Sequence, residues 1–268
     1  MSTTADPALT PSPAASGDGC LVVEDLRRDF GGVWAVDGAS FSIKRGAITS
    51  LIGPNGAGKS TVVGIVGGAI RPAAGRVIFE GEDITHLPPH ERARRGLVRT
   101  YQLSSEFGRL TVLENLLVAA PEQRGERMRT LLLGKRYWRD QERQLVHRAR
   151  GLLERFGMSP KEDEYASNLS GGQKRLVEIM RALMAEPRLV LLDEPMAGVN
   201  PTLARSIEDD LTSLANDGVT LLLVEHELDV VERLSESVVA MALGKVLAVG
   251  TMAELRSRKD VLDAYLGD

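Results

Sequence analysis

Short apolar runs rich in valine, isoleucine and leucine alternate along this chain with longer amphipathic stretches. Their length and residue types predict β-strands. The runs are LVVEDL at 21–26, FSI at 41–43, ITSLIG at 48–53, LVLLD at 189–193 and VTLLLVE at 219–225. The last three lack polar alternation, which is typical of strands buried on both faces of a parallel sheet that helices cover. The pattern therefore predicts an α/β fold.

The middle third of the chain has a helical periodicity. We predict helices over residues 110–119, about 138–156 and 170–185. In the second helix five apolar residues share one face and leave the arginines outside. They are Leu145, Ala149, Leu152, Leu153 and Phe156. We expect these helices to form a subdomain, at about residues 103–187, inserted into an α/β domain that spans residues 19–268.

The composition is that of an ordinary folded protein. The 268 residues include 33 Lys and Arg against 37 Asp and Glu, a formal charge of −4. This balance excludes a strongly basic nucleic-acid binder, so we expect no nucleic-acid partner. With 43% hydrophobic residues the chain can bury a core, which excludes disorder as its main state. Cys20 is the single cysteine, so it cannot form an intramolecular disulfide, and we predict a buried small residue.

The first residues of the chain and one basic segment give indications of where the protein is located in the cell. Residues 1–18 contain three prolines, no lysine or arginine and no apolar block, so they lack the features of a secretory signal. We predict a disordered cytoplasmic tail there. No stretch approaches the roughly 18 to 20 uncharged apolar residues that cross a bilayer. Residues 122–150 carry nine Lys and Arg against four Asp and Glu. That segment is either a solvated helical face or a surface near anionic lipid headgroups or an acidic partner.

A glycine-rich motif, GPNGAGKST at 53–61, lies between a strand-like and a helix-like run. It fits the pattern G-x-x-x-x-G-K-[ST] of a phosphate-binding loop in the context that this hypothesis requires. The glycines let backbone N–H groups surround a phosphate chain, and the positive end of the helix supports the same anion. We expect Lys59 to bridge the β- and γ-phosphates and the Ser60 hydroxyl to hold Mg²⁺. The candidate nucleotide-binding residues of the motif are Gly53, Pro54, Asn55, Gly56, Ala57, Gly58, Lys59, Ser60 and Thr61.

Two carboxylates, Asp193 and Glu194, end the apolar run at 189–193. A carboxylate at the end of a buried strand is costly unless it meets a cation or hydrogen-bond donors. Neighbouring side chains on a strand point in opposite directions, although the end of a strand relaxes this rule. We therefore predict that Asp193 serves a metal ion and that Glu194 is the base for an attacking water molecule. Beside a phosphate loop, the pair predicts nucleotide hydrolysis.

A third motif, LSGGQ at 169–173, stands about 110 residues after the phosphate loop and about 20 before the two carboxylates. Ser170 suits the N-cap of the following helix, and Gly171 and Gly172 free its first N–H groups to approach an anion. The local pattern therefore predicts a second phosphate site formed by Ser170, Gly171, Gly172 and Gln173.

These motifs in this order, followed by His226, resemble the motif set of ABC-type ATPases over nearly the whole chain from about residue 21. The resemblance implies a P-loop NTPase core with an inserted helical subdomain, which binds ATP and Mg²⁺. It implies that LSGGQ serves the ATP of a partner subunit, in a head-to-tail dimer with two composite sites. It also implies that His226 contacts the γ-phosphate, Gln102 touches Mg²⁺ and the water, and Phe30 stacks on adenine. Without the resemblance, His226 reads as a surface histidine and Phe30 as a core residue.

After Glu194 the chain reads Pro-Met-Ala-Gly-Val-Asn-Pro, where many ABC ATPases have a serine and a closing aspartate. This form resembles the ATPases of branched-chain amino acid and amide importers. The same resemblance is seen in the basic insertion around 121–150, in VLENLLVA at 112–119 and in a terminal AYLG. The resemblance implies a homodimer, or a heterodimer with a related ATPase subunit, bound at the cytoplasmic face of the cell membrane. Its other partners would be integral membrane permease subunits, contacted through residues 103–120, and a substrate-binding protein.

Other readings stay open. Leucine-type amino acids are the first substrate class, urea or short amides the second and lipid the third. Lipopolysaccharide-exporting ATPases share the segment after Glu194 but usually have a shorter insertion. A non-transport ABC ATPase shares all the nucleotide motifs, and co-purification with membranes or permeases separates it from a transporter subunit. A P-loop kinase or GTPase acting alone fits only GPNGAGKST and has no use for LSGGQ.

Overall fold

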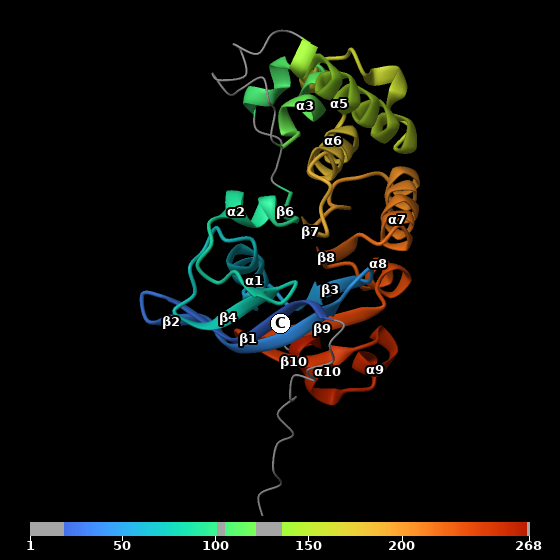
Figure 1. The fold of residues 1–268 in the computed structure, drawn as a ribbon. Coiled ribbons are helices and arrows are strands. Elements are labelled where there is room, and N and C mark those ends of the chain that lie inside the picture. Colours follow the sequence, from blue (N-terminus) through green and yellow to red (C-terminus); the bar gives the residue numbers. More distant parts are fainter. Residues whose placement is uncertain (1–18, 101–104, 122–135, 267–268) are drawn as a thin grey trace, which may run out of the picture.

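The described residues form two β-sheets that helices surround (Figure 1). The computed structural model of the chain describes residues 19–100, 105–121 and 136–266. One sheet has the strand order β2-β1-β4-β5 and the other has the order β10-β9-β3-β8-β7-β6. The predicted tail at 1–18, Gln102 and the part of the basic segment at 122–135 lie outside the described residues.

The larger sheet is built from the apolar runs that lack polar alternation. β3 (Ile48–Ile52) lies between β8 (Thr220–Val224) and β9 (Ser237–Ala242) and pairs in parallel with both. β7 (Leu189–Asp193) pairs in parallel with β8 and with β6 (Leu97–Arg99). Every residue of β3 and β8 is buried. The predicted α/β class and its buried parallel strands are confirmed.

The smaller sheet is antiparallel. β1 (Gly19–Phe30) pairs with β2 (Val33–Lys44) and with β4 (Ala74–Phe79), and β4 pairs with the short β5 (Glu82–Asp83). β10 (Lys245–Gly250) closes one edge of the larger sheet, antiparallel to β9. The sequence prediction included β1 and β2 but missed β4, β9 and β10, although SVVAMA in β9 carries the same apolar signal as the predicted strands.

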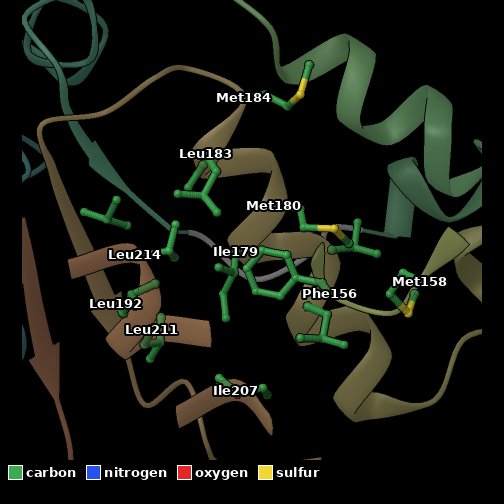
Figure 2. Close-up of a cluster of buried hydrophobic side chains, with 14 of the residues drawn as sticks. Phe156, Met158, Ile179, Met180, Leu183, Met184, Leu192, Ile207, Leu211 and Leu214 are labelled. Atoms are coloured by element: carbon green, nitrogen blue, oxygen red, sulfur yellow. The ribbon is translucent and has the colours of Figure 1, made fainter. Parts of the chain in front are cut away.

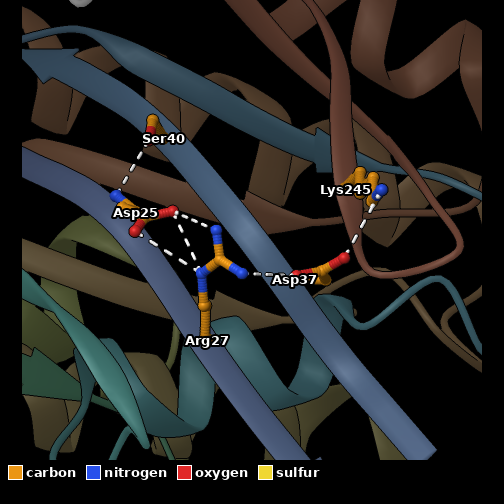
Figure 3. Close-up of polar contacts among 5 residues, drawn as sticks. All are labelled: Asp25, Arg27, Asp37, Ser40 and Lys245. Atoms are coloured by element: carbon orange, nitrogen blue, oxygen red, sulfur yellow. Dashed lines mark hydrogen bonds and ion pairs between the residues drawn. The ribbon is translucent and has the colours of Figure 1, made fainter.

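Charged side chains join the two sheets at one edge (Figure 3). The Arg27 guanidinium of β1 donates hydrogen bonds to Asp25 and to Asp37 of β2, each at 3.1 Å. Lys245 of β10 forms an ion pair with the same Asp37 at 3.4 Å. Partly exposed pairs of this kind contribute about 0–1 kcal/mol each, so their main effect is on orientation. They set the position of β2 relative to β10.

Helices fill the connections between strands, and Figure 1 shows α3, α5 and α6 grouped at the end of the molecule opposite α9 and α10. The helices are α1 (Lys59–Val66), α2 (Pro89–Arg94), α3 (Val112–Ala119), α5 (Arg136–Arg155), α6 (Gly171–Leu183), α7 (Pro201–Asn216), α8 (Leu228–Leu234), α9 (Met252–Arg256) and α10 (Lys259–Leu266), with short 3₁₀ turns at Ser105–Arg109, Ser159–Lys161 and Ala166–Asn168. The three helices predicted for the middle third correspond to α3, α5 and α6. Within the described ranges, none of the helices combines the length and the apolar character that a bilayer crossing requires.

The predicted apolar face of α5 packs inward. Ala149 and Leu153 are buried, Leu145 and Leu152 are partly buried, and Phe156, directly after the end of the helix, is buried as well. Figure 2 shows Phe156 in one cluster with Met180 of α6, Ile207 of α7 and Leu192 of β7. The core of the helical region therefore continues without a break onto one face of the larger sheet.

Alternate residues of β7 enter two different cores. Val190 and Leu192 belong to the cluster shared with the helices, whereas Leu189 and Leu191 belong to a second cluster with the strands of the smaller sheet. A strand with apolar neighbours on both sides needs no polar alternation, which explains the pattern of its sequence. Cys20, in the second cluster, is fully buried, as predicted.

Candidate nucleotide-binding site

The motif GPNGAGKST forms the turn between β3 and α1. Gly53 and Gly58 have φ angles of 152° and 99°, and Gly58 is the N-cap of the helix. A Cβ atom on Gly53 would lie 2.2 Å from the carbonyl oxygen of Met241, and one on Gly58 would lie 2.2 Å from that of Ala35. Neither contact is possible, so both positions require glycine. The loop can therefore pack its backbone directly on the backbones of β9 and β2.

The turn between β9 and β10 supports the phosphate loop from behind. The N–H of Gly244 donates a hydrogen bond to the carbonyl of Ala57 at 3.1 Å. The carbonyl of Gly244 accepts one from the N–H of Asp37 at 2.8 Å. The loop is thus held between β2 and a turn about 190 residues later in the chain, next to the charged network of Arg27, Asp37 and Lys245.

Lys59 is buried at the first position of α1, with 6% of its surface exposed. Its ammonium donates hydrogen bonds to the carbonyl oxygens of Gly53 at 2.6 Å and of Pro54 at 2.9 Å. Burial lowers the pKa of the Lys59 ammonium, while Glu194 and Asp193 act in the opposite direction. Carbonyl oxygens satisfy the donors of an ammonium group but do not neutralise its charge. The buried cation therefore suits an anionic ligand.

Asp193 and Glu194 have different partners at the end of β7. Oδ2 of Asp193 lies 3.2 Å from Nη2 of Arg99, the last residue of the neighbouring β6. Glu194 has a φ of 48°, a left-handed conformation that costs a residue with a Cβ atom about 1–2 kcal/mol. The backbone thus leaves the strand conformation between the two carboxylates.

Glu194 contacts His226 across the site. Oε1 of Glu194 lies 2.7 Å from Nε2 of His226. The two side chains are 44% and 42% exposed, so each remains accessible to a ligand. His226 follows β8 at its carboxyl end, the edge at which open α/β sheets bind ligands. The imidazole holds the carboxylate in one orientation.

A pocket of about 330 Å³ brings half of the predicted residues together. This volume lies in the range of small-molecule and cofactor sites. The predicted residues that line it are Phe30, Asn55, Gly56, Gly58, Lys59, Ser60, Thr61, Glu194 and His226. Ala35 and Val224 complete the wall, whereas Gly53, Pro54, Ala57 and Asp193 do not line it.

The residues that line the pocket are of two chemical kinds. The Phe30 ring is half exposed, and the Arg28 guanidinium lies 4.8 Å from its centroid. The phosphate loop and the buried Lys59 also line the pocket. An accessible aromatic ring and a buried cation match the base and the phosphates of a nucleoside triphosphate. The residues present therefore fit ATP.

The LSGGQ segment has a different environment. The Ser170 hydroxyl accepts a hydrogen bond from the Gln173 N–H at 3.3 Å, and Oε1 of Gln173 accepts one from the Ser170 N–H at 3.0 Å. The predicted N-cap is confirmed. A Cβ atom on Gly171 would meet nothing within 4 Å, but one on Gly172 would lie 2.5 Å from Cδ2 of Leu203. None of the four predicted residues lines the pocket that contains Lys59.

Comparisons with known proteins agree with this site. A family model described as ABC transporter matches residues 36–197. The chain belongs to the ABC transporter family. The "Probable branched-chain amino acid transport ATP-binding protein LivG" of Archaeoglobus fulgidus is 41% identical over 247 residues, which cover 92% of this chain and 95% of that protein. The high-affinity branched-chain amino acid transport ATP-binding protein LivG of Salmonella typhimurium is 37% identical, with 92% and 98% covered.

Solved structures of ABC ATPases share the fold. A nucleotide-free ATP-binding cassette from an ABC transporter has a TM-score of 0.82 at 37% identity, covering 93% of this chain and 100% of that chain. A structure of the ADP conformation of an ATP-binding cassette has a TM-score of 0.81 at 37% identity, with 93% and 99% covered. The predicted family, fold class and ATPase activity are confirmed. The domain boundaries and the roles of individual residues stay predictions.

Sequence reasoning missed several residues of this ABC ATPase site. Arg99 stands three residues before Gln102, and the expectation that Asp193 needs a cation could have indicated it. Arg175 donates a hydrogen bond to the carbonyl of Glu194 at 3.2 Å. Glu225 precedes His226 and is buried, a position that the apolar run alone did not distinguish. Gln102 lies outside the described residues, so its predicted contacts with Mg²⁺ and water stay a prediction.

Proposed function

We propose that this ABC ATPase is the nucleotide-hydrolysing subunit of an importer for branched-chain amino acids. Relatives with that substrate class in their names are 37–41% identical over 92% of this chain, and this similarity is the observation that carries the proposal. The pocket with Lys59, Glu194 and His226 supports the ATPase step. In this proposal the permease and the receptor, not the ATPase, contact the amino acid.

The pocket supplies the binding half of the reaction. The phosphate loop and the first turn of α1 attract the phosphates, and the Lys59 ammonium exchanges its carbonyl partners for phosphate oxygens. Phe30 stacks on adenine. Ser60 and Asp193 offer the oxygen ligands that Mg²⁺ prefers, and Gln102 is a third candidate. When bound, Mg²⁺ neutralises charge on the β- and γ-phosphates.

Glu194 is the proposed general base. Its contact with His226 at 2.7 Å orients one carboxylate oxygen, and the other is left to accept a proton from the attacking water. Lys59 and His226 stabilise the charge that spreads over the departing phosphoryl group. The strained backbone of Glu194, with a φ of 48°, is consistent with a residue placed for function.

The LSGGQ segment supports a head-to-tail dimer with two composite sites. The Ser170 and Gln173 side chains each accept a hydrogen bond from the other residue's backbone N–H, and none of the segment's four predicted residues lines the pocket that contains Lys59. Gly171 is exposed at the start of α6, where the first N–H groups and the helix dipole attract an anion. In the proposed dimer, each α6 closes the pocket of the partner, which is a second copy or a related ATPase subunit.

A groove of about 450 Å³ between α2 and α5 is the proposed contact with the permease subunits. It is lined by Ala93, Arg94, Pro121, Gln141, Gln144, Leu145, Arg148 and Ala185. Arg94 is exposed, so an acidic segment of the permease suits the groove. Arg148 is already paired with Glu186. Its lining residues come from both sides of the expected 103–120 stretch in the sequence, and none of them belongs to it. In this proposal the subunit binds peripherally at the cytoplasmic face of the membrane.

Reconstitution tests the proposed function. The chain would be assembled in proteoliposomes with the permease subunits encoded beside it, and uptake would be measured with the matching receptor protein. We expect uptake of leucine-type amino acids that requires ATP and is lost with Glu194→Gln. ATP-driven uptake of urea or an amide would instead assign the subunit to a urea or amide importer. Extraction of lipid would contradict the proposal that the transporter is an importer. ATP hydrolysis by a chain that binds no permease would indicate a non-transport ABC ATPase.

A further inference from the structure

The carboxyl group of Glu225 is buried beside the Glu194–His226 pair and has no part in the mechanism above. Glu225 follows the last residue of β8 and is 4% exposed. The N–H of Met196 donates to its Oε1 at 3.4 Å, and the N–H of His226 donates to the same carboxylate. Met196 is itself buried, in the turn after β7. One carboxylate therefore bridges the turn that carries Glu194 and the turn that carries His226.

Backbone contacts join the same two turns at neighbouring points. The N–H of Glu194 donates to the carbonyl of Val224, the last residue of β8, at 2.9 Å. On the other side, Arg175 of α6 donates to the carbonyl of Glu194 at 3.2 Å. Glu225 is thus the side-chain member of a set of contacts that determines how far Glu194 stands from His226.

An apolar residue would occupy the position of Glu225 at lower cost. Burial raises the pKa of the Glu225 carboxyl to about 7, and the negative charges of Glu227 and Glu194 act in the same direction. A leucine would avoid this penalty but would leave the N–H groups of Met196 and His226 without their acceptor. The benefit of the carboxyl group therefore lies in its hydrogen bonds to the two turns.

We propose that Glu225 is a positioning residue for ATP hydrolysis, which ties the turn after β7 to the turn after β8 and so keeps Glu194 and His226 in contact. The inference rests on the proposed ATPase site. A displacement of about 1 Å in a catalytic arrangement can cost on the order of 10²-fold in rate. Lys59 and Phe30 bind the nucleotide from other elements, so loss of the tie lowers kcat and leaves the nucleotide Kd unchanged.

Glu208 is a matched control on the same pair of segments. It lies on α7, is 7% exposed, and accepts hydrogen bonds from Arg233 of α8 at 2.8 and 2.7 Å. It therefore joins the helices that follow the two turns but does not touch the turns themselves. Glu208→Leu removes a buried carboxylate of equal size without disturbing the contacts of Met196 or His226.

The experiment compares Glu225→Leu, Glu225→Gln and Glu208→Leu in the assembled ATPase. Nucleotide Kd is measured with a fluorescent ATP analogue, kcat by phosphate release and folding by thermal melting. We expect Glu225→Leu to lower kcat by about 30- to 100-fold with Kd within about threefold of wild type. Glu225→Gln, which keeps an oxygen acceptor, should restore kcat to within about threefold. Glu208→Leu should lower the melting temperature and leave kcat unchanged.

Two outcomes would overturn the inference. One is a wild-type kcat in Glu225→Leu, and the other is an equal loss of kcat in Glu208→Leu at the same loss of melting temperature. Glu225→Ala replaces Glu225→Leu if the leucine variant does not fold, with the same readouts. A wild-type chain that hydrolyses no ATP would reject the proposed function itself, so the two failures are distinguishable.

Discussion

The two glycine-rich helix starts of this ABC ATPase have similar sequences but different environments. At α1, the phosphate loop lies against β2, β9 and the turn at Gly244, and side chains from β7 and β8 face it across one pocket. At α6, Ser170 and Gln173 hydrogen-bond to each other's backbone N–H, and neither residue lines the pocket that contains Lys59. The first has a pocket within its own chain, whereas we propose that the second meets a ligand bound by another subunit.

The positive charge at the two helix starts also differs. Lys59 is a buried cation whose hydrogen bonds go to carbonyl oxygens, so its charge attracts an anion strongly. The start of α6 offers the partial charge of a helix dipole, which is worth about 0.3–1 kcal/mol at an exposed position. We therefore expect affinity for ATP to reside at α1 and α6 to contribute after the nucleotide is bound.

The largest expected effect is a loss of turnover at the pocket that contains Lys59 and Glu194. Glu194→Gln removes the proposed base, so turnover should fall by about 10²- to 10⁴-fold while ATP affinity is kept. The ATP-bound dimer should then accumulate. Steady-state phosphate release measures the first effect, and size-exclusion chromatography with ATP measures the second. Full retention of hydrolysis would remove Glu194 as the base.

A substitution at the start of α6 should separate ATP binding from closure of the dimer. Ser170→Arg should leave ATP binding by the single chain nearly intact, because Ser170 does not line the pocket, but should block closure of a dimer. Lys59→Ala should instead lose ATP binding. A mixture of the two variants can form at most one complete site per dimer, which a titration of hydrolysis against protein concentration would reveal. Additive activity that does not depend on concentration would argue against composite sites.

The free energy of unfolding should depend on pH through Glu225, which lies beside the Glu194–His226 pair. The pKa of Glu225 is raised from an ordinary value of 4.5 to about 7, so the folded chain holds this proton more tightly than the unfolded chain. The free energy of unfolding should therefore fall as pH rises from about 4.5 to about 7, by about 3 kcal/mol from this group. Chemical denaturation across that range should show a flatter curve for Glu225→Gln. An identical slope in the variant would contradict the assignment.

The smallest effect should distinguish the two glycines of α6. A Cβ atom on Gly172 would lie 2.5 Å from Leu203, so Gly172→Ala should destabilise the fold by about 1–3 kcal/mol through overpacking. Gly171→Ala is the control, because its Cβ atom meets nothing within 4 Å, and its effect should stay within about 0.5 kcal/mol. Denaturant unfolding measures both. Equal losses would show that α7 does not constrain Gly172.

Much of this fold could be predicted from short segments of the sequence. The buried strands β3, β7 and β8 are readable because apolar neighbours on both faces select continuous apolar runs, and the Ser170 cap is readable because its partners lie within one helical turn. β5 and β6, with two and three residues, are too short to leave a pattern. β4 and β9 carry a usable apolar signal that the prediction did not include.

The sequence by itself determined the phosphate loop, the carboxylate pair, the α6 cap and the family, since each depends on residues that are close together in the chain. Only the tertiary structure decided that Arg99 meets Asp193, that Glu194 meets His226 and that Glu225 holds the turn after β7. These pairs are 94, 32 and 29 residues apart. They meet because parallel pairing brings the carboxyl ends of β6, β7 and β8 to one edge, and no strand specifies its neighbours through its own pattern.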